Sequence, residues 1–86
     1  MIQKIDVPVS VELCHDHKLR RTYPRLVVWE GKDYPIEKIG YHHTFFEGRV
    51  LHHVFSVSAK AMFFRLDLNS ENLTWRVKEI ADGLPD

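Results

Sequence analysis

The chain is poor in the features that mark several common protein classes. It has one cysteine, Cys14, so no internal disulfide can form, and its first residues lack the apolar run of a secretory signal. We therefore expect a reducing, cytoplasmic setting. No membrane span is indicated, and the 12 basic and 12 acidic residues cancel. No overall charge attracts nucleic acid or a membrane surface, and neutrality slightly favours self-association.

Catalytic signatures are also missing. The sequence contains no nucleophile elbow, phosphate-binding loop, dinucleotide fingerprint or zinc-protease helix. Cys14 stands beside His15 and His17, but a lone cysteine is much more often inert than nucleophilic. Support for an enzyme is therefore confined to one metal-binding hypothesis given below, and a non-enzymatic role is the favoured interpretation.

The patterning that is present is that of β-strands. Residues 5–13 alternate between apolar and polar, which predicts a half-buried strand, and Pro8 within it predicts an edge strand because proline donates no hydrogen bond. Further segments rich in strand-forming residues follow along the chain. We predict a single all-β domain over residues 1–86, a strongly bent antiparallel sheet of about six strands, barrel-like or sandwich-like. A short helical turn over residues 79–86 would be ended by Gly83 and Pro85.

Turn residues set the expected strand pairing. Gly31-Lys32 suits a type II′ hairpin turn that places Trp29 opposite Tyr34. A change in the parity of apolar residues predicts a bulge near Glu37, Lys38 or Gly40. The requirement that apolar faces meet then predicts three further loops. They pair Phe45 with Arg49, Val57 with Met62, and Leu68 with Leu73.

Four of the six histidines lie in the hairpin of residues 40–58. The expected registers place His42, His52 and Asp67 side by side on the outer face, on strands about 4.8 Å apart. Two nitrogens and one oxygen suit zinc or ferrous iron, with a coordination position left open. The alternative is a row of solvated polar residues. His43 and His53 are expected on the inner face as hydrogen-bonded core residues.

A loop before the second strand offers two further candidates. His15-Asp16-His17 would present two imidazoles to one side, with Cys14 as a third ligand. The longer zinc-ligand spacings are missing, so a solvated loop is the favoured interpretation. Basic residues accompany Tyr23 there, and basic side chains beside aromatic rings bind single-stranded nucleic acid. This basic set comprises Lys18, Arg20, Arg21 and Arg25. Such a run is more often an ordinary charged loop.

Apolar doublets place large side chains on both faces of several strands. They are Val27-Val28, Phe45-Phe46 and Phe63-Phe64. The second face must be covered by the chain's own ends, by closure into a small barrel, or by another subunit. A homodimer, or a complex with another protein, is therefore expected.

The central run Trp29-Glu-Gly31-Lys-Asp-Tyr34-Pro-Ile36-Glu-Lys-Ile39, with a Val-Pro-Val-Ser-Val strand before it and Leu73-Thr-Trp75-Arg-Val77 at the end, resembles small bacterial β-domains of unknown function. The resemblance implies a compact twisted sheet or barrel and a bacterial cytoplasmic origin. It transfers no active site, and the paired histidines are not part of its pattern.

Taken together, these features favour a small, self-associating binding or interaction module. The alternatives are a metal-binding protein that uses His42, His52 and Asp67, and an accessory domain for single-stranded nucleic acid.

Overall fold

A computed structural model describes residues 2–82, and these form one antiparallel β-sheet with seven strands and no helix. The predicted all-β antiparallel fold is therefore confirmed, with one strand more than expected. Residues 79–82 lie in the last strand rather than in a helical turn, and residues 83–86 lie outside the described residues. None of the described residues forms a helix long and apolar enough to cross a membrane. The strands are β1 (Ile2–Asp16), β2 (Arg21–Trp29), β3 (Lys32–Pro35), β4 (Lys38–Glu47), β5 (Val50–Ala59), β6 (Met62–Asn69) and β7 (Thr74–Asp82).

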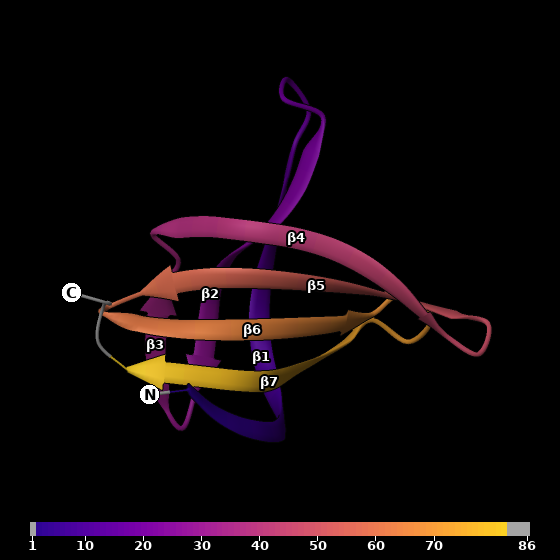
Figure 1. The fold of residues 1–86 in the computed structure, drawn as a ribbon. Helices are drawn as coiled ribbons and strands as arrows, with labels where there is room; N and C mark the ends of the chain where they lie inside the picture. The colour runs from indigo at the N-terminus through magenta and orange to yellow at the C-terminus, as the bar shows by residue number, and fades with distance from the viewer. Residues whose placement is uncertain (1, 83–86) are drawn as a thin grey trace.

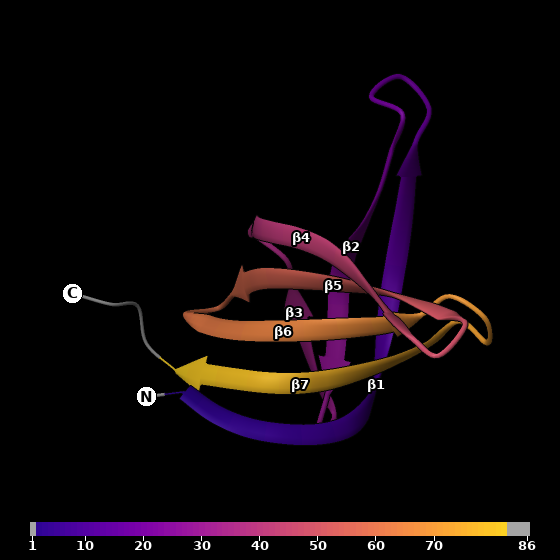
Figure 2. The same cartoon turned by 45° about the vertical axis from the view of Figure 1, so that its right-hand side comes forward.

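The long first strand joins two parts of the sheet. The strand order is β3-β2-β1-β7-β6-β5-β4. The first half of β1, from Ile2 to Val9, pairs with β7, and its second half, from Ser10 to Asp16, pairs with β2. Figure 2 shows β1 running beside β7 and then turning to rise with β2 as a projecting hairpin, which we call the arm. The edge-strand prediction is therefore wrong for β1, although Pro8 lies in the half that pairs with β7 alone.

The two edge strands, β3 and β4, are consecutive in the chain (Figure 1). At the link between them, the Ile36 amide donates to the Arg25 carbonyl at 2.9 Å and the Glu37 amide donates to the Ser58 carbonyl at 2.9 Å. The two ends of the sheet thus meet at this point. They separate beyond it, so the sheet is strongly bent but is not closed into a barrel.

The core lies between the β4–β7 part of the sheet and β1–β3. We call the face of β4–β7 that points into it the inner face and the opposite one the outer face. Phe64 is fully buried, and its ring packs edge-on against Trp29 at 5.9 Å and Tyr34 at 5.1 Å between centroids. The other buried members of this core are Val27, Phe55, Val57, Ala59, Leu66 and Val77. Aromatic pairs in this edge-on geometry stabilise the folded state by more than the burial of their surface alone contributes.

The turns differ from the predicted ones in position. The β2–β3 turn is Glu30-Gly31, with φ of 51° and 77°, which is a type I′ pattern rather than type II′ at Gly31-Lys32. The β5–β6 turn is Lys60-Ala61, again with both φ values positive. The predicted bulge is confirmed at Gly40, where the β4–β5 register shifts between Ile39 and Tyr41.

The β6–β7 loop has the expected length but is displaced by one residue, because Asn69 pairs with Thr74 and residues 70–73 form the turn. The Asn69 side chain accepts hydrogen bonds from the amides of Glu71 at 2.9 Å and Asn72 at 3.3 Å. Asparagine thus supplies the local capping that its frequency in turns reflects.

Candidate functional site

The β4–β5 turn decides which histidines share a face. Glu47 lies opposite Val50, so the turn is Gly48-Arg49 and Phe45 lies opposite His52 rather than Arg49. The register differs from the predicted one by an odd number of residues, which exchanges the two faces of a strand. His42 therefore lies on the inner face, opposite Phe55, and His43 lies on the outer face.

The predicted row of His42, His52 and Asp67 is consequently not formed as a unit. His52 and Asp67 do meet on the outer face, where the Nδ1 of His52 lies 2.7 Å from Oδ1 of Asp67. They belong to neighbouring strands, β5 and β6, but sit diagonally, because His52 is paired with Asn69 and Asp67 with Val54. His42 is on the other side of the sheet.

The His52–Asp67 pair is a buried polar pair. His52 is 8% exposed and Asp67 is 5% exposed. The Phe45 ring stacks on the His52 imidazole with centroids 4.7 Å apart and planes 15° apart. Because the Nδ1–H of His52 donates to the Asp67 carboxylate, the tautomer of the imidazole that forms this bond presents a lone pair at Nε2 on its other side.

Further polar groups surround this pair in a pocket of about 280 Å³. The Glu47 carboxylate lies 3.5 Å from Nε2 of His52. On β6 and β7, Arg65 donates to Glu79 at 3.0 Å. Three buried nitrogens around the pocket have no hydrogen-bond partner among the described residues, namely His43 Nδ1, His52 Nε2 and Arg65 Nε.

The inner-face histidines form a separate group. His42 Nε2 lies 3.0 Å from His53 Nδ1, and the His42 ring stacks on Phe55 with centroids 4.2 Å apart. Burial, followed by the neighbouring imidazoles of His53 and His43, lowers the pKa of His42. This group is held by stacking and by one hydrogen bond between imidazoles, so packing accounts for it.

The His15-Asp16-His17 candidate lies at the end of the arm, where the side chains of His15 and Asp16 form hydrogen bonds with nearby residues of the arm. The His15 Nδ1 lies 2.7 Å from the Thr22 hydroxyl, and Asp16 accepts a hydrogen bond from the Leu19 amide at 3.0 Å. Cys14 lies opposite Tyr23 and raises the pKa of that phenol. Across residues 2–82, no group of three or more histidine, cysteine, aspartate or glutamate side chains is arranged to hold a metal ion.

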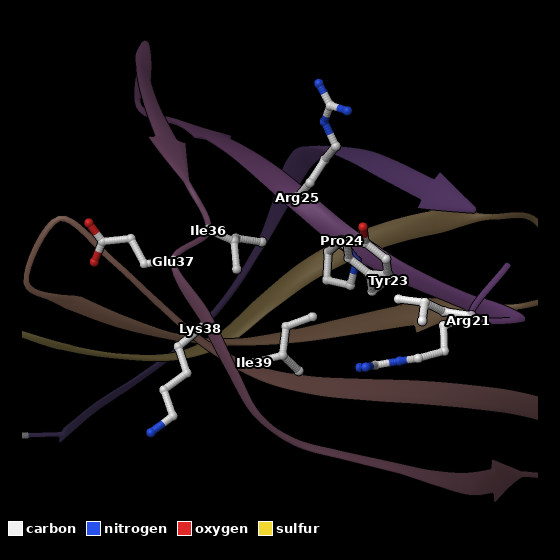
Figure 3. Close-up of a pocket in the computed structure, with 9 residues that line it drawn as sticks. Arg21, Tyr23, Pro24, Arg25, Ile36, Glu37, Lys38 and Ile39 are labelled. Carbon is white, nitrogen blue, oxygen red and sulfur yellow. The ribbon is translucent and has the colours of Figure 1, made fainter. Parts of the chain in front are cut away.

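The basic residues flank a second feature, a wedge-shaped cleft between β2 and β4 of about 450 Å³. Its narrow end is at Ile36, where the edges of the sheet meet, and it widens toward the arm (Figure 3). Figure 3 shows Pro24, Ile36 and Ile39 directed into the cleft beside Tyr23. The cleft thus has an apolar floor.

Of the predicted nucleic-acid residues, Arg21 and Arg25 line the cleft, whereas Lys18 and Arg20 lie in the turn at the arm's end. Arg21 extends into the cleft in Figure 3, and Arg25 points away from it. Arg25 is within 3.7 Å of Glu12. The four basic residues are therefore close along the arm but do not form one continuous surface.

Two functional features were not predicted. The cleft depends on the divergence of β2 from β4, which has no local sequence signal. Glu47 reaches the outer-face pocket because the β4–β5 turn has two residues. In the sequence, Gly48 is the residue that could have predicted this turn, since its φ of 63° suits the first position of a type II′ turn.

A search of protein families, curated proteins and solved structures finds no match to this chain. The resemblance to small bacterial β-domains stays a prediction.

Proposed function

We propose that the protein is a non-enzymatic binding module that receives an extended polypeptide segment in the cleft between β2 and β4. The observation that carries this proposal is the pair of strand edges bordering the cleft. Within residues 2–82, β4 forms a ladder with β5 alone, and residues 21–24 of β2 form one with β1 alone. Unpaired edges offer backbone donors and acceptors to an added strand.

The floor of the cleft supports the same ligand. An inserted strand directs alternate side chains toward the core, and Pro24, Ile36 and Ile39 offer them apolar contacts. The volume of about 450 Å³ lies within the range of roughly 300–1,000 Å³ that ligand sites occupy. Alternating apolar residues in the ligand are therefore favoured.

The charge of the arm favours acidic residues at one end of that ligand. Lys18, Arg20 and Arg21 are exposed at the arm's end, where Asp16 is the neighbouring acid and is engaged by the Leu19 amide. Positive potential beyond the wide end of the cleft would attract carboxylates and accelerate association.

Single-stranded nucleic acid is the second candidate, because the same basic residues adjoin Tyr23. Binders of this kind usually stack successive bases on several aromatic rings, and Tyr23 is the one aromatic residue among the described residues that line the cleft. The unpaired edges are better suited to a peptide, which uses their backbone groups.

The test begins with selection of a binder from a random twelve-residue peptide library displayed on phage. The selected peptide is synthesised, and amide hydrogen exchange of the protein is followed by NMR with and without it. We expect added protection along β4 and in residues 22–23, and loss of binding when alternate peptide amides are N-methylated. Arg21→Glu should lower the affinity for the peptide and make binding less dependent on salt concentration. Arg49→Glu, in the exposed β4–β5 turn, should change neither.

Other outcomes contradict the proposal. A selected peptide that leaves the β4 amides unprotected would show that the cleft is not its site. Salt-sensitive binding of an oligothymidine, with no peptide selected, would favour the nucleic-acid candidate. A dimer in light scattering whose β4 edge is protected without peptide would mean that a second copy of the chain fills the cleft.

A further inference from the structure

The outer-face pocket carries a separate inference, independent of the cleft. We infer that it is a binding site for a divalent metal ion of the zinc type, with His52 Nε2 and the Glu47 carboxylate as ligands, His43 as the third, and Asp67 as the group that orients His52.

The first argument is the orientation of His52. Asp67 Oδ1 is 2.7 Å from Nδ1, and Phe45 stacks on the ring. A carboxylate that holds one imidazole nitrogen, leaving the other for the metal, is the usual arrangement around metal-bound histidine. The Nε2 left by this arrangement is buried and has no hydrogen-bond partner among the described residues.

The second argument is the distance to Glu47. Its Oε1 lies 3.5 Å from His52 Nε2. Two ligand atoms bound to tetrahedral zinc at about 2.0–2.1 Å are roughly 3.3–3.4 Å apart. A lone pair facing a carboxylate at this distance is unfavourable unless a cation or a proton lies between them, and a zinc ion fits with a shift of a few tenths of an ångström.

The third argument concerns charge. Of the two basic side chains that line the pocket, Arg65 is paired with Glu79 at 3.0 Å, and Lys78 lies 3.3 Å from Asp6, which it shares with Arg76. The lining of the pocket also includes the carboxylates of Glu47 and Asp67, so that three acids face two bases there. This excess of acid favours the binding of a cation at the pocket.

His43 completes the protein ligands. Its Nδ1 is buried without a partner and lines the same pocket. The described side chains do not yet gather three donors around one point, so His43 must rotate toward Nε2 of His52 when the ion binds. Two nitrogens and one oxygen then hold the ion, and the fourth position is taken by water.

The test is titration of zinc chloride into the full chain after treatment with EDTA, followed by calorimetry and native mass spectrometry. We expect one ion per chain and, with cobalt(II), the visible absorption of a tetrahedral site. Glu47→Gln, at a side chain that is 80% exposed, should abolish tight binding without unfolding the protein. Asp67→Asn, which removes no ligand, should weaken binding about 10–100-fold. His42→Gln, on the opposite face, should leave it unchanged.

Two results would overturn the inference. The first is an absence of stoichiometric binding at micromolar zinc, which would mean that a proton rather than a metal joins Glu47 and His52. The second is binding that survives Glu47→Gln and is lost in His15→Gln, which would locate the ion at the end of the arm.

Discussion

Replacing the members of the His52–Asp67 pair should reveal strong coupling between them. Asp67 has a side chain that is 6% exposed, and its hydrogen-bond partner among the described side chains is His52 Nδ1 at 2.7 Å. His52→Leu would leave a buried carboxylate without a partner, which costs about 3–5 kcal/mol. Asp67→Leu would leave the buried Nδ1–H of His52 without its hydrogen-bond acceptor, which costs about 1–3 kcal/mol.

The double variant removes both polar groups and fills the space with apolar atoms, a change that is often close to neutral. We therefore expect a coupling energy of at least about 2 kcal/mol, against a total of roughly 5–15 kcal/mol for a typical domain. Urea unfolding in EDTA, followed by the fluorescence of Trp29 and Trp75, measures all three variants. If the single effects sum to the double effect within about 0.5 kcal/mol, the pair is not coupled and the reasoning fails.

Three further outcomes are expected. Phe64→Ala should lower the free energy of unfolding by about 3–5 kcal/mol, since Phe64 is fully buried; urea denaturation measures this, and a loss below about 1 kcal/mol would contradict the packing. Arg76 holds the pKa of Asp6 below its usual value, so the stabilisation is present above the unfolded-state pKa and is lost as pH falls through the folded-state pKa; Asp6→Asn should flatten the acid side of the stability profile, and an unchanged profile would refute the pairing. Gly48→Ala should cost about 1 kcal/mol in thermal unfolding because its φ is 63°, whereas a stabilising effect would mean that the turn is assigned wrongly.

The sequence was informative about which residues form strands and less so about how the strands align. Alternation in residues 5–13 predicts β1 correctly, and the parity change predicts the bulge at Gly40. The β2–β3 and β5–β6 turns moved by one residue each, an even change in register that leaves inward side chains inward. Val27, for example, lies opposite Tyr34 instead of Ile36, and both belong to the core or pack against it.

The β4–β5 register was not predictable in the same way. Both faces of β5 carry apolar residues, such as Val54 on one and Phe55 on the other, and both are buried. Hydrophobic patterning therefore does not distinguish the two alignments, and the length of the turn alone decides between them. This is why His42 and His43 were assigned to the wrong faces and why Glu47 was overlooked.

The shared strand β1 also bears on how the chain folds. The β2–β3 hairpin and the β4–β7 meander each form from neighbours in sequence, but Ile2 must find Ala81 at the other end of the described chain. Closing so long a loop is costly before its contacts form, and such pairings slow folding. We expect the first half of β1, from Ile2 to Val9, to dock late, so that newly made chains carry an unpaired β7 edge until it does. Conditions that delay this docking should therefore cause the chains to aggregate while their other strands remain formed.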